Sequence, residues 1–236
     1  MNIEKLMSEN AAKKPASRRA SNVTANVDFS KLIRMGFNEH PYGMSPKALE
    51  IMKAETEKSN FYGDFGKGAL KKAIADFYGL DFANVAASAG SSPLIEAIGC
   101  AFLNPGDEVL MCPTFAAFID MAQIRQAVPV VVPLNEDKTY DLDGLYNAIT
   151  KKTKIIVVCN PNNPTSSAIL RSDMERLLTF CEQHDIFVMI DETYVEFAPV
   201  IEDVTAVPFT KTFKNLMVLR GVSKFFAAPG VRLGYG

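Results

Sequence analysis

Two segments of the chain place small or amide side chains directly after an apolar stretch. In residues 88–93 (SAGSSP), small residues would let a ligand approach the backbone, and the N–H groups of a following helix would attract an anion such as a phosphate. An ordinary serine-capped turn explains this segment equally well. Residues 159–165 (CNPNNPT) hold two Asn-Pro pairs, which fix an extended loop. Packing alone explains such a loop poorly, so we interpret it as a candidate binding segment.

Two further segments bring charged groups to the ends of apolar stretches. Asp191 begins residues 191–194 (DETY), where a carboxylate is costly unless it gains a partner such as a cationic ligand atom. A helix cap or a surface salt bridge is the alternative. Lys224 follows Ser223 among apolar and small residues, and desolvation frees a lysine amine to attack an aldehyde. Taken alone, Lys224 is more simply a lysine that faces solvent.

The four segments together match the groups of one cofactor. Pyridoxal phosphate carries a phosphate, a pyridine nitrogen, a phenolic oxygen and an aldehyde. For each of these groups the chain offers a counterpart: a phosphate cradle, a buried carboxylate, an asparagine and a potentially nucleophilic lysine. The combination therefore predicts a pyridoxal-phosphate site.

The elements that must position these segments alternate along the chain. The strands lack polar alternation and are separated by helices, which predicts a mostly parallel sheet that is buried on both faces. This is a doubly wound, three-layer α/β fold, in which ligands bind beyond the carboxyl ends of the strands. Strands are expected at 85–87, 109–111, 128–132, 155–159, 187–190, 216–219 and from within 231–233, and helices at 46–58, 67–78, 92–103, 115–125, 142–149 and 172–183.

Composition excludes several classes of protein. Of 236 residues, 48% are apolar and 22% charged, which suits a globular protein, and a net charge of −2 disfavours a nucleic-acid binder. No apolar run approaches the roughly 20 residues of a membrane span, and no secretory signal is visible, so we expect a cytoplasmic protein. Two histidines and four scattered cysteines predict no metal site, and the cysteines read as small buried hydrophobic residues.

Two regions are predicted. Residues 1–33 are polar and basic, which favours an N-terminal arm or tail. Residues 34–236 carry the alternating elements and form the cofactor-binding domain.

Residues 34–236 resemble the fold-type I pyridoxal-phosphate aminotransferases of class I/II, and most of all the histidinol-phosphate aminotransferase branch. In order and combination, the motifs that carry the resemblance are specific for this family and much less specific for a substrate. They are residues 38–43 (NEHPYG), 102–109 (FLNPGDEV), 159–165, 191–194, 223–224 (SK) and 230–232 (GVR).

The resemblance implies roles around the cofactor ring. Lys224 would bond covalently to the cofactor's aldehyde carbon and later carry the proton between substrate and cofactor. Asp191 would pair with the protonated pyridine nitrogen, which keeps the ring an electron sink. Asn163 and Tyr194 would hydrogen-bond the phenolic oxygen, and Phe115 would stack on the ring face.

The resemblance also implies a phosphate site and a shared dimer site. Ser223, Arg232 and the amides near Ser91 and Ser92 would hold the phosphate, with Arg232 suited to bidentate binding. Tyr62 would reach the phosphate in the neighbouring subunit of a homodimer.

The substrate pocket would be lined by Asn38 and His40, as in the family's N-terminal segment. The family continues well beyond this length to form a small C-terminal domain, which supplies the arginine for the substrate carboxylate, so we expect the large domain without that part. Ser166 and Gly221 also depart from the family's usual residues. These differences suggest a divergent member.

The implied activity is transfer of an amino group, in amino-acid biosynthesis, between a 2-oxo acid and an amino acid or amino-alcohol phosphate of the histidinol-phosphate or aromatic type. The first alternative is a pyridoxal-phosphate-dependent decarboxylase or lyase of the threonine-phosphate type. The second is a truncated, non-catalytic paralogue.

Overall fold

The computed structural model describes residues 28, 31, 33, 35–62 and 68–236. Contacts divide the chain into two units, residues 1–39 and 40–236. The N-terminal arm predicted at 1–33 lies almost entirely outside the described residues. None of the helices in the described ranges has both the length and the apolar character needed to cross a membrane.

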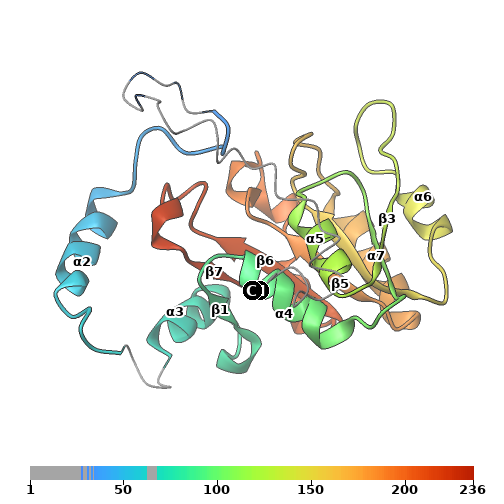
Figure 1. Ribbon diagram of the computed structural model, residues 1–236, viewed down its shortest axis with the longest axis horizontal. Helices are drawn as coiled ribbons and strands as arrows, with labels where there is room; N and C mark the ends of the chain where they lie inside the picture. The colour runs from blue at the N-terminus through green and yellow to red at the C-terminus, as the bar shows by residue number, and fades with distance from the viewer. Residues whose placement is uncertain (1–27, 29–30, 32, 34, 63–67) are drawn as a thin grey trace, which may run out of the picture. The chain divides into compact units, whose positions relative to one another are not determined.

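The second unit is built on a seven-stranded sheet in the order β1-β7-β6-β5-β4-β2-β3 (Figure 1). The five strands from β6 to β3 are parallel, whereas β7 runs antiparallel to both β6 and β1. The predicted mostly parallel α/β fold is therefore confirmed. The strands are β1 (Ala87–Ser88), β2 (Glu108–Met111), β3 (Val128–Val131), β4 (Thr153–Cys159), β5 (Phe187–Asp191), β6 (Leu216–Gly221) and β7 (Gly234–Tyr235).

Helices connect the strands, and most begin or end within about three residues of the predicted positions. The α-helices are α2 (Pro46–Thr56), α3 (Ala69–Tyr78), α4 (Ser92–Phe102), α5 (Ala117–Ile124), α6 (Leu142–Asn147) and α7 (Arg171–Gln183). Short 3₁₀ turns are η3 (Phe82–Asn84), η4 (Val195–Phe197), η5 (Ile201–Asp203), η6 (Val207–Lys211) and η7 (Pro229–Val231).

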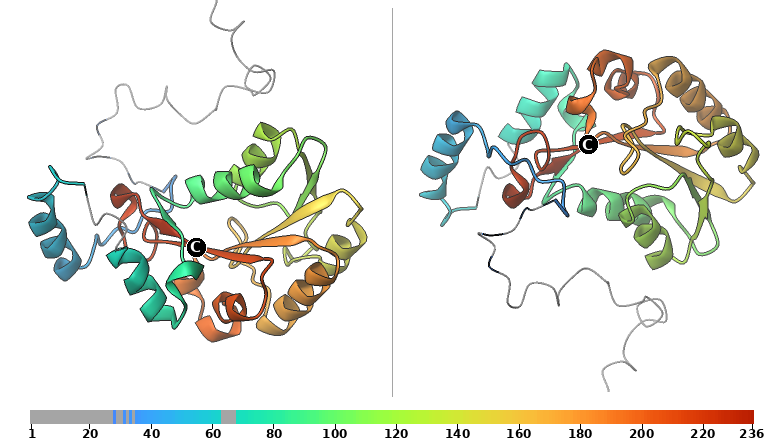
Figure 2. Two further views of the ribbon diagram at one scale, coloured as in Figure 1. Left: turned by 90° about the horizontal axis from the view of Figure 1, so that it is seen from below. Right: turned by 90° about the horizontal axis from the view of Figure 1, so that it is seen from above.

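Two hydrophobic clusters hold the layers together, one on each face of the sheet. On one face, α4 and α5 bury residues such as Ile95 and Phe118 against β2, β4 and β5. On the other face, α6 and α7 bury Leu145 and Leu178. Figure 2 shows these helices above and below the sheet. Because the strands are covered on both sides, they can be apolar throughout, as β4 is from Ile155 to Cys159.

Two local expectations were wrong. The last strand was expected to start within 231–233, but Pro229–Val231 forms a 3₁₀ turn and β7 starts at Gly234. Proline lacks an N–H for a strand ladder, and Arg232 adopts a left-handed backbone, φ 56°. Cys100 is also exposed, although the other three cysteines are buried as expected.

A close backbone contact fixes the strand β7 against the loop before α4. A side chain at Gly234 would collide with the backbone between Gly90 and Ser91. Gly90 itself has φ +97°, a conformation that favours glycine. The absence of a Cβ at Gly234 therefore allows the β1–α4 loop to lie directly on β7.

Gly234→Ala should lower the free energy of unfolding by about 3 kcal/mol, because backbone atoms cannot move aside as a side chain can. Chemical denaturation measures the change. Gly230→Ala is the matched control, since nothing lies within 4 Å of its added methyl group. Equal stabilities of the two variants would contradict the close contact.

Candidate active site

Three loops that follow neighbouring strands converge at one edge of the sheet. The register places Cys159 of β4 opposite Asp191 of β5, and Asp191 opposite Leu219 of β6. All three strands are parallel, so their carboxyl ends lie together (Figure 1). The sheet therefore brings residues 160–165, 191–194 and 223–224 to one place, as the sequence predicts.

Asp191 is a buried carboxylate at the centre of this edge. Its exposed fraction is 4%, and its Oδ1 accepts hydrogen bonds from the Thr193 backbone N–H at 2.9 Å and the Thr193 hydroxyl at 2.5 Å. Burial raises the pKa of Asp191, while these bonds and the positive charge of Lys224 act in the opposite direction. The carboxylate is therefore suited to a cationic partner.

Lys224 lies near the Tyr194 ring, in the loop that follows β6. Its Nζ is 5.8 Å from the centre of the Tyr194 ring, and its charge acts on the Asp191 carboxylate. Lys224, Ser223 and Tyr194 are all half-buried. The three predicted catalytic residues thus lie at the carboxyl end of the same parallel strands, and their catalytic roles stay predictions.

The asparagines of the loop at 160–163 differ in their surroundings: some bond the protein backbone, and one is a predicted ligand residue. Asn160 is buried and bonds the backbone of Ile169 in both directions, at 3.1 and 2.8 Å, so its role is structural. Asn162 donates to the Pro113 carbonyl at 3.2 Å. Its own Oδ1 is buried without a hydrogen-bond partner. Asn163, the predicted ligand residue, is half-buried.

Three of the predicted phosphate residues, Ser91, Ser92 and Arg232, lie at the amino end of α4. Ser91 occupies the cap position and Ser92 is the first helical residue, at the start of the predicted helix 92–103. The Arg232 guanidinium lies in the space that a side chain at Gly90 would fill. Arg232 Nη1 also donates to the Pro229 carbonyl at 2.9 Å. A helix terminus and a guanidinium side by side form a cradle for an anion.

Phe115 lies in the loop that follows β2, next in the sheet to β4. It is half-buried, and its ring meets the Phe118 ring edge-on, with 6.2 Å between the centres. This contact fixes the Phe115 ring against the core. Its stacking on a cofactor stays a prediction.

The remaining predicted residues lie earlier in the chain. Tyr62 is 87% exposed, and Asn38 belongs to the first unit. His40 accepts a hydrogen bond from the Tyr42 N–H at 3.3 Å through Nδ1. The roles of Tyr62, Asn38 and His40 stay predictions.

Sequence reasoning missed a buried ion network that adjoins the site. Arg220 Nε lies 3.1 Å from Glu192 Oε2, an ion pair without hydrogen-bond geometry, and Arg220 Nη1 donates to Glu196 Oε1 at 2.8 Å. Burial raises the pKa of Glu192 to about 7, and Arg220 opposes part of that rise. The sequence feature that could have predicted this network is a charged residue, Arg220, at the end of an otherwise apolar strand.

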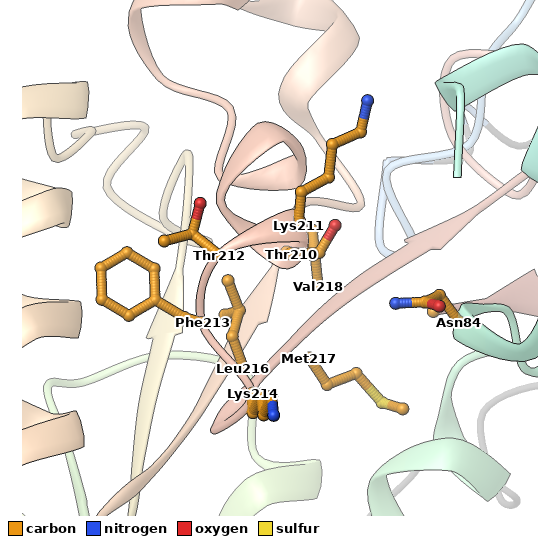
Figure 3. A pocket seen from close by; sticks show the side chains of 10 residues that line it. Asn84, Thr210, Lys211, Thr212, Phe213, Lys214, Leu216, Met217 and Val218 are labelled. Atoms are coloured by element: carbon orange, nitrogen blue, oxygen red, sulfur yellow. The ribbon is translucent and has the colours of Figure 1, made fainter. Parts of the chain in front are cut away.

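A cavity of about 390 Å³ lies at the opposite, amino end of β6. Figure 3 shows its side chains, which come largely from β6 and from the segment around η6, with Lys211 extending away from Met217. No predicted site residue lines this cavity. Within the described ranges, no three His, Cys, Asp or Glu side chains are grouped so that they could hold a metal ion.

Comparisons with known proteins agree with the arrangement of the site. A histidinol-phosphate aminotransferase from Akkermansia muciniphila is 35% identical over 206 residues, which cover 87% of this chain and 56% of that protein. An aromatic amino acid aminotransferase from Rhodococcus jostii is 36% identical over 209 residues, which cover 88% and 58%. The chain thus spans between a half and two thirds of these relatives' lengths.

A solved structure extends the similarity to three dimensions. The histidinol-phosphate aminotransferase of Sinorhizobium meliloti, in complex with pyridoxal-5'-phosphate, aligns with a TM-score of 0.76 at 27% identity, over 85% of this chain and 54% of that one. The family model described as aminotransferase class I and II matches residues 30–236. Since this match covers most of the sequence and includes every strand of the sheet, the chain belongs to the aminotransferase class I and II family.

Proposed function

We propose that residues 34–236 form the cofactor-binding large domain of a pyridoxal-phosphate-dependent aminotransferase. The observation that carries the proposal is the buried Asp191 carboxylate at the end of β5, with Lys224 in the loop that follows the neighbouring strand β6. Burying a carboxylate is costly, and a protonated ring nitrogen would supply the missing positive charge. The amine of Lys224, in the loop after the next strand of the sheet, would act on the same ligand.

The residues fit the cofactor at two separate groups. The cradle of Arg232 and the amino end of α4 suits a phosphate, and Asp191 suits a pyridinium. Ser223, Ser91 and Ser92 would add phosphate contacts, while Phe115 would cover the ring. When bound, the cofactor supplies an electron sink for carbanion chemistry at the substrate's Cα.

The chain's own groups would then perform distinct tasks. Asp191 would hold the proton on the ring nitrogen, and Asn163 and Tyr194 would donate hydrogen bonds to the phenolic oxygen. Lys224 would bind the cofactor through its amine and would move the proton at the substrate's Cα. Arg232 would anchor the phosphate and so fix the ring's position in the site.

The relatives' names suggest the substrates. We propose an amino donor of the histidinol-phosphate or aromatic type and a 2-oxo acid as the acceptor, in a cytoplasmic homodimer. Tyr62 would reach the partner's cofactor phosphate, and Asn38 and His40 would line the substrate pocket.

Lys224→Ala tests the proposal directly. The unmodified protein should take up pyridoxal phosphate, and borohydride should then fix the cofactor on the peptide that contains Lys224. The variant should retain no reduced adduct and lose transamination, because no other predicted group replaces the amine. Lys211→Ala, on η6 at the other end of β6, is the matched control and should behave as the unmodified protein. An adduct mapped to another lysine would overturn the assignment.

Asp191→Asn should separate function from stability. Because burial raises the pKa of Asp191, the folded protein binds more protons than the unfolded chain, and its stability falls as pH rises past the ordinary aspartate range. The amide can still accept the Thr193 bonds, so the cofactor-free variant should melt no lower than the unmodified protein at about pH 8. Its transamination rate should fall by about 100-fold or more.

Thermal melts between about pH 5 and pH 8, without cofactor, check the stability half of this prediction. Lower stability of Asp191→Asn across the whole range would show that Asp191 is a structural carboxylate. An unchanged transamination rate would show that Asp191 does not pair with the ring nitrogen of the cofactor.

A further inference from the structure

A charged network lies on the opposite face of the sheet from Asp191. Asp191 pairs with Leu219 across β5 and β6, and the Glu192 N–H donates to the Leu219 carbonyl at 2.8 Å. The next residues, Glu192 and Arg220, are therefore neighbours as well. Side chains alternate along a strand, so this second pair points away from the face that carries Asp191.

Both members of the pair are buried and held. Glu192 has no exposed surface and accepts hydrogen bonds from the Thr205 hydroxyl at 2.9 Å and the Ala206 N–H at 2.5 Å. The Arg220 side chain is 7% exposed. Its guanidinium reaches Glu192 through Nε at 3.1 Å and Glu196 through Nη1 at 2.8 Å.

The same guanidinium extends the network to α3 and β7. It lies 5.5 Å from the centre of the Tyr78 ring, and the Tyr78 and Tyr235 hydroxyls are 3.0 Å apart. Tyr235 is also the cross-strand neighbour of Arg220. One side chain thus contacts the exit of β5, the turn η4 and the helix α3, and Tyr78 links it to the strand β7.

The network holds these elements together at a high cost in desolvation free energy. Two carboxylates face one guanidinium, and the Glu196 Oε2 atom is buried without a hydrogen-bond partner. An apolar packing of similar volume commonly gives equal or greater stability. A guanidinium that faces two carboxylates from different positions, however, fixes their relative placement in a way that apolar contacts do not.

The residues of the network lie close in sequence to the predicted catalytic residues. Glu192 directly follows Asp191, Glu196 lies two residues after Tyr194, and Arg220 lies four residues before Lys224. We infer that Arg220 is a positioning residue, which fixes the loop of Asp191 and Tyr194 relative to the loop of Lys224. This inference rests on the proposed function, since it concerns the placement of the same three groups.

Two variants test the role of Arg220. Arg220→Lys keeps the charge but cannot pair with both carboxylates through a planar fork. Glu196→Ala removes one partner and leaves Arg220 and Glu192 as a neutral pair, so it is the variant that is better tolerated by the fold. The matched controls are Arg176→Lys, in an exposed pair with Asp173 at 3.2 Å, and Glu202→Ala, on the exposed surface of η5.

The main readout is the pH midpoint of the bound cofactor's absorption change, because it depends on how the groups of Lys224, Asp191 and Tyr194 are placed. Both variants should still take up pyridoxal phosphate, shift this midpoint by about one pH unit, and lose turnover on the order of 100-fold with KM little changed. The controls should match the unmodified protein in both measurements.

The outcomes are distinguishable. Variants that melt at lower temperature but keep the original midpoint and turnover would overturn the inference and leave Arg220 a structural residue. If Arg220→Lys does not fold, the midpoint of Glu196→Ala decides in the same way. Failure of the unmodified protein to take up the cofactor would overturn the proposed function, and the inference with it.

Discussion

The burial of the Asp191 carboxylate is the constraint on which the rest of the site depends. At 4% exposure the carboxylate has lost most of its water, and the Thr193 donors and the positive charge of Lys224 compensate part of that loss. Such a group is stable in place only if surrounding elements are rigid. The parallel strands β4, β5 and β6 provide this rigidity, because apolar helices cover both of their faces. The negative charge of Asp191 is therefore incompletely compensated, and in the proposed function the protonated ring nitrogen of the cofactor balances it.

Strand alternation lets one pair of strands carry two different charged systems. Asp191 and Leu219 lie on one face of β5 and β6, and Glu192 and Arg220 lie one residue later on the other. In the proposed function the first system presents a carboxylate to the cofactor, whereas the second is closed by protein partners such as Thr205. The consecutive acids 191 and 192 are therefore not redundant, since the pleat of the strand sends them to separate environments.

Sequence patterns predicted what depends on local composition. The apolar runs around Ile155 and Val188 predicted buried parallel strands, and their ends predicted where chemistry would gather. Long-range pairing was beyond such patterns. The Arg220–Glu192 ion pair joins residues 28 positions apart, and it depends on strand register that no local signal specifies. The start of β7 was misplaced for a similar reason, because Pro229 and the left-handed Arg232 turn the chain before it can enter the ladder.

The asparagine loop illustrates why residues of one type within a single motif need not share a role. Asn160 bonds the backbone of Ile169 and Val204 from a fully buried position, which ties the loop to the segments around residues 169 and 204. Asn162 ties the same loop to Pro113, next to the segment that carries Phe115. These bonds fix the backbone on one side of Asn163, so its amide can be held in place without a rigid element of its own. A site whose contacts must be accurate to a fraction of an ångström requires this kind of support, and Asn160 and Asn162 provide it for this motif.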